Sequence, residues 1–432
     1  MRRGISSFFL TQYKSLLKTN FNLHLVNRMQ KQVLLNSIKG IFNPKFIDYL
    51  IYILIGFWFF IRLTDFASFT FSIRQVYILQ IKFTRGLTIL FVLIYFYKWL
   101  TFSKDKFNFL LCVIFLLTSY FLNKFAKTQL VFDLFFIPLF LCQFLYKEKF
   151  YKYVLVSFCL LFILVIIMHY LGYSQDIAYF SRSEGIRRYT LGFAHPNGLG
   201  FIIALFSIFY VILKTKFKFY DYFLLFVFSS FCYFVPNSVT SSCIIILLAV
   251  SVFLSHYISR RKFDRKSTYV ILFLCLFIVG TVLFFTYYIT FTENFKEYIQ
   301  NLPGSMWARF ELSKKGYDIL GFSLLGKYDE YCAMTLSIAQ KYGFQAVWLI
   351  LDCSYFYLPI VHGFFVFGIY LAMIIYSLIR GVMRQDFLYA FILVVIVVYG
   401  VSETTIFRPV MMPLFAYPFF FYSKKKLALK SK

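Results

Sequence analysis

Almost the whole chain consists of apolar runs approaching 20 residues, separated by short stretches that carry charge. A helix needs about 20 predominantly apolar residues to cross the hydrocarbon core of a bilayer. Lipid offers no water to the backbone, so each crossing must satisfy its hydrogen bonds internally, as a helix does. The near-continuous apolarity also excludes the alternating pattern of a membrane β-barrel. The sequence therefore predicts an all-α, polytopic membrane protein.

The apolar runs predict about twelve transmembrane helices within one integral membrane domain at residues 46–422. Only 15% of the residues are charged, whereas soluble domains usually carry about 25%. We expect the spans at residues 47–63, 86–102, 107–123, 129–146, 153–172, 198–213, 219–235, 239–256, 269–288, 361–379, 386–401 and 405–422.

Basic residues in the short connections predict the orientation, because loops rich in Lys and Arg favour the cytoplasmic side. Five basic clusters fall on one side of the membrane if both termini are cytoplasmic. They are Lys147, Lys149 and Lys152; Lys214, Lys216 and Lys218; Arg260, Arg261, Lys262, Arg265 and Lys266; Arg380 and Arg384; and Lys424, Lys425 and Lys426. The connection 64–85 disagrees, since it would place Arg74, Lys82 and Arg85 outside.

The two ends of the chain are basic. Residues 1–45 contain no acidic residue and predict a cytoplasmic segment on the membrane surface, or else an upstream mis-start with Met29 as the true beginning. They lack the features of a signal peptide. Residues 423–432 predict a basic cytoplasmic tail. Topology and anionic lipid explain much of the net charge of +27, so we expect membrane lipid and no nucleic acid as a partner.

No motif for a metal, a nucleotide or another cofactor is present. The chain has neither Cys-x-x-Cys nor His-Glu-x-x-His, and no phosphate-binding loop of an ATPase. We therefore expect no metal, no cofactor and no ATP hydrolysis. Six of the eight cysteines lie inside predicted spans; only Cys332 and Cys353 fall in or near an outer segment, where a disulfide stays open.

Two long segments, 173–197 and 289–360, are predicted on the outer side. They contain Arg182, Arg187, Arg188 and Arg309, which the preference of basic residues for the inside does not explain. Arginine presents a planar fork of donors that suits phosphate. The alternative is that each arginine is simply solvated or touches lipid headgroups.

The stretch "RRYTLGFAHPNGLG", residues 187–200, predicts a helix start with an anion site. His195 or Asn197 can cap a helix beginning near Pro196. Free N–H groups at that end would face outward beside the arginines. Gly198 and Gly200 would allow close approach of a helix or a substrate. For His195, capping is the plainer alternative to a direct chemical role.

The second outer segment reads "SMWARFELSKKGYDILGFSLLGKYDEY", residues 305–331. Its apolar residues recur at helical spacing, which predicts an amphipathic helix in the outer interface. Farther along, Asp352 lies in an apolar context that is too short and interrupted for a full span.

The order of these motifs resembles Wzy-type O-antigen and capsule polymerases and the related O-antigen ligases. The residues that carry the resemblance are Arg187 or Arg188 leading into Gly192, Phe193, His195, Pro196, Asn197 and Gly200; Arg309 followed by Leu325 and Gly326; Leu351, Asp352 and Tyr355; and Ser402 and Glu403. The chain departs from relatives at Cys353, where they often have Asn, and in the spacing from Arg188 to Gly192. Ligases place a histidine near the position of Asp352.

The resemblance implies a fold related to membrane-embedded C-type glycosyltransferases, in the cytoplasmic membrane of a bacterium. It implies polymerisation, at the outer face, of oligosaccharide repeat units carried on undecaprenyl pyrophosphate, with a chain-length regulator and a flippase as partners. Arg187, Arg188 and Arg309 would stabilise the leaving pyrophosphate. The candidate general bases are Asp352, Glu403 and His195. Other candidate substrate-binding residues are Arg182, Asn197, Gly198, Gly200 and Tyr355.

Two other functions stay open. A ligase that moves a finished glycan to another acceptor would share nearly all these features. A transporter or flippase would be expected to keep charged residues along a path through several spans. The predicted spans are mostly uncharged in their middles, with Asp133 as one exception, which favours an enzyme acting at the surface.

Overall fold

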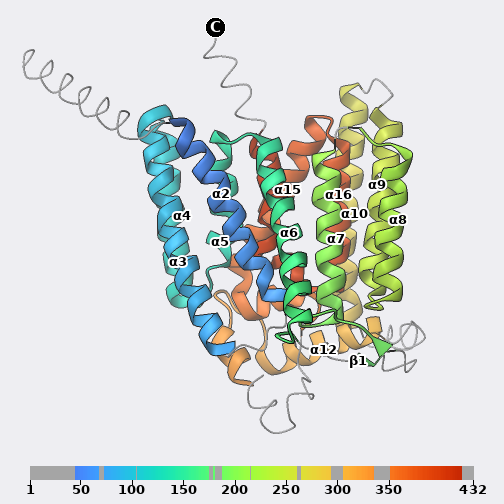
Figure 1. Ribbon diagram of the computed structural model, residues 1–432. Coiled ribbons are helices and arrows are strands. Elements are labelled where there is room, and N and C mark those ends of the chain that lie inside the picture. Colours follow the sequence, from blue (N-terminus) through green and yellow to red (C-terminus); the bar gives the residue numbers. More distant parts are fainter. Residues whose placement is uncertain are drawn as a thin grey trace, which may run out of the picture.

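The computed structural model describes residues 44–67, 73–103, 105–174, 179–180, 187–214, 216–259, 264–292, 305–334 and 351–420. These residues are mostly helical, as predicted (Figure 1). Among them, the strands β1 (Tyr179–Phe180) and β2 (Arg187–Arg188) form a short antiparallel ribbon. Of the segments predicted at 1–45 and 423–432, only residues 44 and 45 are among the described residues, and Arg182 lies outside them as well.

Within the described residues, eight helical segments are long and apolar enough to cross a membrane, by length and composition. They correspond to α2 (Pro44–Leu63), α3 (Ile73–Lys98), α4 (Lys106–Phe125), α6 (Lys147–Tyr170), α7 (Pro196–Leu213), α9 (Val239–Ser259), α10 (Arg265–Phe291), and the combined segment of α14 (Ser354–Tyr357), the π-helical turn η6 (Leu358–His362) and α15 (Gly363–Met383).

Four shorter apolar helices account for the remaining predicted runs. They are Leu130–Phe144, which begins with α5 (Leu130–Phe136), α8 (Phe219–Phe234), α16 (Phe387–Tyr399) and Pro409–Phe420. Each predicted run therefore coincides with helix, while the count of twelve crossings stays a prediction. The helical segment predicted to begin at residue 361 begins at Ser354, and its path turns at Gly363, where φ is +90°, between the π-helical turn Leu358–His362 and the rest of α15.

The helices stand side by side and run in alternating directions (Figure 1). The start of α6 and the end of α7 therefore lie at one end of the bundle, at the top of Figure 1. The start of α7 and the short helix α12 (Ser305–Leu320) lie at the opposite end. The predicted inner and outer connections are thus grouped at opposite ends of the bundle.

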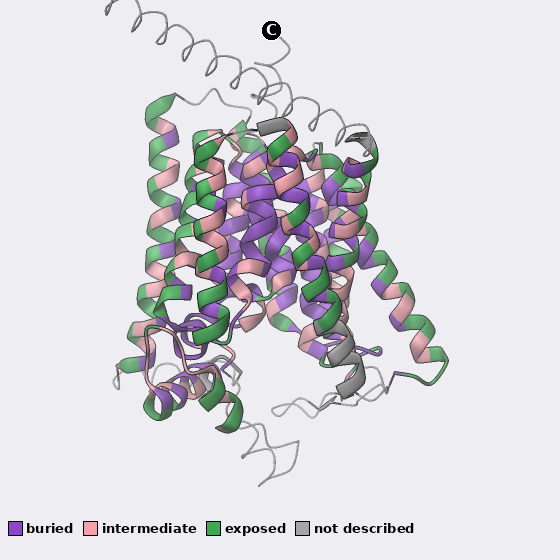
Figure 2. Cartoon of the chain, turned by 90° about the vertical axis from the view of Figure 1, so that its left-hand side faces the viewer, coloured by how far each residue is buried: buried purple, intermediate pink, exposed green. Residues whose placement is uncertain are grey.

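Figure 2 shows buried residues in the middle of the bundle and exposed residues on the outer helices. Many of the exposed residues are apolar, such as Ile114 of α4 and Phe277 of α10. Of the residues in the apolar stretch of α7, 72% are buried, compared with 17% of those in the apolar stretch of α10. Gly200 explains the close packing of α7 on α9: a Cβ there would lie 2.6 Å from the Cβ of Ser238. Small residues of this kind let membrane helices approach closely.

Buried polar groups join neighbouring helices. Asp133 accepts a hydrogen bond from Arg62 at 2.5 Å, between Oδ2 and Nη2, so the acidic exception among the predicted spans is paired. The hydroxyls of Ser241 and Tyr399 lie 2.9 Å apart and link α9 to α16. Pairing lowers the cost of removing such groups from water.

The segment after α12 is hydrogen-bonded through its backbone to the turn between η6 and α15. The Lys327 amide donates to the Ile360 carbonyl at 3.0 Å, and the Phe364 amide donates to the Ser323 carbonyl at 3.0 Å. Gly326 and Gly363 meet at this contact with φ of +85° and +90°. A Cβ on Gly363 would lie 2.3 Å from the Leu324 carbonyl oxygen. Only glycine fits there without displacing the backbone.

We predict that Gly363→Ala destabilises the protein by at least about 2 kcal/mol, because the side chain would combine backbone strain with a steric clash. Gly368→Ala in the same helix is the matched control, since a Cβ there meets nothing within 4 Å. The control should leave stability unchanged or raise it by about 0.5–1 kcal/mol. Thermal unfolding of the purified variants checks this; equal midpoints for the two would contradict it.

Candidate functional site

The outer-segment motifs meet at the end of the bundle where α12 lies. Helix α12 contacts α10, α14 and η6. The β1–β2 ribbon lies at the same end (Figure 1). Residues from four separate parts of the sequence, near 188, 309, 352 and 403, converge here.

Arg309 of α12 lies between two carboxylates. Its Nη2 donates to Glu403 Oε1 at 3.4 Å, and its Nε is 3.9 Å from Asp352 Oδ2. Arg309 is 8% exposed. A buried guanidinium needs such partners, because removing a charge from water is costly. The long distances fit a cluster whose members could re-orient toward a bound anion.

The two carboxylates differ in access. The side chain of Glu403 is 9% exposed, whereas that of Asp352 is 38% exposed. The backbone carbonyl of Glu403 accepts a hydrogen bond from the Ser354 hydroxyl, and the Ser354 amide donates to the Gly400 carbonyl at 2.9 Å. Glu403 is therefore fixed behind Arg309, and Asp352 is the carboxylate that a substrate can reach.

Burial perturbs both acids. Desolvation raises the pKa of Glu403 to about 7; Arg309 opposes this shift and Asp352 adds to it. The positive charges of Arg188 and Arg408 oppose it further. Desolvation also raises the pKa of Asp352, against the effect of Arg309. Acids whose pKa lies closer to neutrality are suited to proton transfer.

Arg188 joins this cluster from the segment before α7. Its Nη2 donates to Asn197 Oδ1 at 2.5 Å and its Nε donates to the Pro236 carbonyl at 2.9 Å. Burial lowers the pKa of Arg188, Glu403 opposes this shift and Arg309 adds to it. Arg188 nevertheless stays a cation, because guanidinium does not lose its proton in proteins. Asn197 thus positions an arginine at the start of α7.

His195 is the N-cap of α7. It is one of the two residues that the sequence offered for this role. Its Nδ1 accepts a hydrogen bond from the Asn197 amide at 3.1 Å. The residue keeps solvent contact, yet enough protein surrounds the ring that desolvation, followed by the charge of Arg188, lowers its pKa to about 4. His195 is therefore neutral at physiological pH. With Nδ1 accepting, we assign the ring proton to Nε2, which suits it to donate a hydrogen bond.

The structure separates Arg187 from Arg188. Adjacent residues of a strand point to opposite faces. Arg187 is exposed, with its guanidinium carbon 5.1 Å from the centre of the Tyr189 ring. Of the two arginines that the sequence left open, Arg188 is the one with Glu403 and Arg309 as charged neighbours.

Other candidate substrate-binding residues lie in different surroundings. Tyr355 is fully buried and its hydroxyl donates to the Val397 carbonyl at 2.5 Å, so its ring packs α14 against α16. A substrate contact would need accessible surface, which Tyr355 lacks. Gly200 serves the approach of α7 to α9. Gly198 keeps space around it, since a Cβ there would meet only Phe66 at 3.6 Å.

Arg408 is a residue of this site that the sequence did not single out. It is exposed, its guanidinium carbon lies 5.1 Å from the centre of the Phe66 ring, and its charge acts on Glu403. An arginine before Pro409, inside a predicted span and near its outer end, was the signal that could have found it.

Aromatic rings border the cluster near Asp352. Tyr331 and Tyr357 meet edge to face at 5.9 Å, and Tyr357 meets His362 at 5.5 Å. Asp352 is among the charged neighbours of Tyr331, and Arg408 is one of Tyr357. The rings of Tyr331 and Tyr357 are partly exposed and offer flat apolar surface beside the carboxylate, whereas His362 is buried.

The described residues contain no group of three or more His, Cys, Asp or Glu side chains that could hold a metal ion. Cys332 and Cys353 are both free, with Cys332 exposed and Cys353 buried, so the disulfide left open by the sequence is not formed.

The arrangement combines fixed cations with an accessible carboxylate. Arg188, Arg309 and Arg408 can stabilise negative charge on phosphate oxygens. Asp352 can accept a proton, and the neutral His195 can donate a hydrogen bond. At the start of α7, Pro196 has no N–H, and the amides of Asn197 and Leu199 are bonded to His195, so the anion donors of this site are mainly the arginines. These parts suit a reaction in which a phosphate group leaves while a hydroxyl is deprotonated.

No family model, curated protein or solved structure matches this chain. The resemblance to Wzy-type polymerases therefore rests on the quoted motifs alone, and membership of that family stays a prediction.

We predict that the Glu403 carboxyl titrates with a midpoint near pH 7. Infrared spectroscopy over a range of pH measures this midpoint. The absorption band of the protonated Glu403 carboxyl is the one that disappears in Glu403→Gln. A midpoint near 4.5, the ordinary value, would contradict the burial of this group. Glu311→Gln is the matched control, because Glu311 is an exposed acid of α12 whose carboxylate lies 2.9 Å from Lys315 Nζ.

The same shift predicts how stability depends on pH. The folded protein holds the Glu403 proton up to about pH 7, whereas the unfolded chain releases it near pH 4.5. The free energy of unfolding should therefore fall as the pH rises from about 5 to 7. Glu403→Gln should lack this component of the fall, and Glu311→Gln should retain it.

Proposed function

We propose that this protein is an integral-membrane glycosyltransferase that polymerises oligosaccharide repeat units carried on undecaprenyl pyrophosphate. The product is an O-antigen, capsular or exopolysaccharide chain. The observation that carries the proposal is the convergence of Arg188 and Arg309 with Asp352 and Glu403 at one end of an apolar helical bundle. The order of motifs that resembles Wzy-type polymerases supports the same interpretation.

In the proposed reaction, a hydroxyl oxygen of the acceptor sugar attacks the anomeric carbon of the donor. The bond from that carbon to the pyrophosphate oxygen breaks, and the lipid pyrophosphate leaves with the electron pair. Arg188 and Arg309 stabilise the charge that develops on the leaving group. Preorganised cations of this kind are among the largest contributions to catalysis.

Asp352 takes the proton of the attacking hydroxyl. It is the more exposed of the two carboxylates, and its raised pKa improves it as a base. Glu403 positions Arg309, whose Nη2 lies 3.4 Å from Glu403 Oε1. His195 donates a hydrogen bond to a substrate oxygen, since its lowered pKa makes it a poor base. Tyr331 and Tyr357 supply an apolar face for a sugar ring.

The location proposed for this site is the outer face of a bacterial cytoplasmic membrane, with both termini inside. The basic connections 147–152 and 214–218 lie at the end of the bundle opposite to α12, in agreement with the preference of Lys and Arg for the cytoplasmic side. A flippase would deliver the substrate to this face, and a chain-length regulator would act on the product.

Replacement of Arg309 by lysine tests the role of the guanidinium. Arg309→Lys keeps the positive charge beside Glu403 but loses the planar fork. We expect a fall of about 10²-fold or more in polymer formation. The measurement sizes the glycan on the lipid carrier in cells whose own gene is deleted and replaced by the variant. Arg380→Lys, at the opposite end of the bundle and bonded to Tyr376 at 3.0 Å, is the control.

The size of the stranded glycan discriminates the alternatives. Single repeat units on the outer face of the deletion strain support polymerisation. Long chains that stay on the carrier indicate a ligase, and single units trapped inside indicate a flippase; either result contradicts the proposal. Membrane abundance of Arg309→Lys equal to that of Arg380→Lys excludes a folding defect.

Asp352→Asn tests the assignment of the base. The amide keeps the shape of the side chain but cannot take a proton, so the turnover number should fall about 10²–10⁴-fold. The apparent KM for the lipid-linked substrate should change much less. Loss of turnover in Glu403→Gln together with full activity of Asp352→Asn would instead make Glu403 the base.

A further inference from the structure

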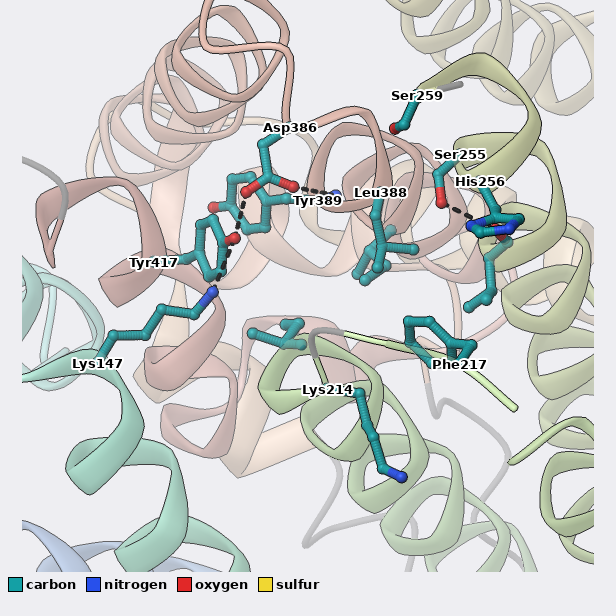
Figure 3. Close-up of a pocket in the computed structure, with 13 residues that line it drawn as sticks. Lys147, Lys214, Phe217, Ser255, His256, Ser259, Asp386, Leu388, Tyr389 and Tyr417 are labelled. Carbon is teal, nitrogen blue, oxygen red and sulfur yellow. Dashed lines mark hydrogen bonds between the residues drawn. The ribbon is translucent and has the colours of Figure 1, made fainter. Parts of the chain in front are cut away.

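A second polar site lies at the end of the bundle opposite to Arg309. A cavity of about 320 Å³ opens there (Figure 3). It is lined by the first residue of α6, Lys147, the residue after α7, Lys214, the last residue of α9, Ser259, and the N-cap of α16, Asp386. Since four helices end at this level, the cavity lies where the headgroups of a bilayer begin.

One wall of the cavity carries a hydrogen-bonded chain of three side chains. Lys147 Nζ donates to the Tyr417 hydroxyl at 2.9 Å, and that hydroxyl donates to Asp386 Oδ2 (Figure 3). Asp386 Oδ1 also accepts from the Tyr389 amide at 3.4 Å. Each carboxylate oxygen has a second lone pair. The partly exposed Asp386 can therefore accept a further donor from the cavity.

Another wall supplies a second cation and apolar surface. The ammonium of Lys214 points away from Asp386 and Tyr417 in Figure 3 and pairs with Asp221 at 2.8 Å between Nζ and Oδ1. It has three donors on a flexible stem, which lets it turn toward a phosphate in the cavity. Ile212, Val252 and Leu388 also line the cavity. Apolar lining beside groups of both charges suits an amphiphile whose headgroup carries both signs.

We propose that this cavity binds the headgroup of a membrane phospholipid that carries a phosphate and a primary ammonium. The phosphate lies at Lys147 and Lys214, and the ammonium donates to Asp386. Small-ligand pockets enclose about 300–1,000 Å³. The cavity therefore takes the headgroup, and the acyl chains stay in the bilayer along the apolar wall. This site is independent of glycosyl transfer at the other end.

Lipid retention by the full chain tests the ammonium contact. The delipidated protein is exposed to vesicles of equal parts phosphatidylethanolamine, phosphatidylglycerol and phosphatidylcholine, and the retained lipid is identified by native mass spectrometry. We expect phosphatidylethanolamine to be retained roughly tenfold over phosphatidylcholine, whose quaternary ammonium has no N–H to donate. Asp386→Asn should abolish this preference while preserving the helix cap, because Asn caps helices as well as Asp.

A second variant tests the cavity itself. Leu388→Trp places a large ring in the space and should remove retention of phosphatidylethanolamine. Lys149→Gln is the control, because Lys149 lies outside the lining, with Nζ 4.7 Å from the centre of the Tyr49 ring. Its retention should match that of the unaltered protein.

Three results would overturn the proposal. Equal retention of the three lipids contradicts the ammonium contact. Retention that survives Leu388→Trp places the lipid elsewhere on the protein. Displacement of the lipid by millimolar inorganic phosphate, with phosphate bound in its place, would make this a site for a soluble phosphate.

Discussion

The ion pairs of Arg309 are the interaction on which the candidate site depends. The Arg309 guanidinium is only 8% exposed. Glu403 and Asp352 face it and offset the free-energy cost of burying its charge. Each carboxylate comes from a distant part of the chain, so this contact ties α12 to the segments before α14 and after α16. The same burial that makes the pairs necessary raises the pKa of both acids. Structural support and reactivity therefore have one physical cause, the removal of charge from water.

The bundle separates its polar chemistry into two ends. The end with α12 combines arginines with perturbed carboxylates, and the opposite end combines lysines with a tyrosine-bridged aspartate. Between them, polar contacts such as Ser241 with Tyr399 are paired within the core. Arginine suits bidentate contact with phosphate, whereas lysine is a hydrated point charge. This difference in residue type agrees with chemistry at one end and lipid contact at the other.

The sequence predicted the all-α character and the places of the apolar helices, because apolar run length depends only on local composition. It also predicted that His195 or Asn197 caps α7, since a cap depends on adjacent residues, and the cap is His195. It could not choose between Arg187 and Arg188, because that choice depends on a strand face and on the distant Glu403. For the same reason it could not predict the contact of Tyr355 with Val397, which lies 42 positions away. Arg408 was missed because it was counted within a span.

We propose that the cluster around Arg309 performs glycosyl transfer with lipid pyrophosphate as the leaving group. The most direct measurement uses the purified chain in vesicles that contain a defined lipid-linked repeat unit. It counts the undecaprenyl pyrophosphate released and the glycosidic bonds formed. The account predicts one molecule of carrier released for each bond, in chains of increasing length. Vesicles in which the protein is folded but neither releases carrier nor lengthens the glycan would contradict it.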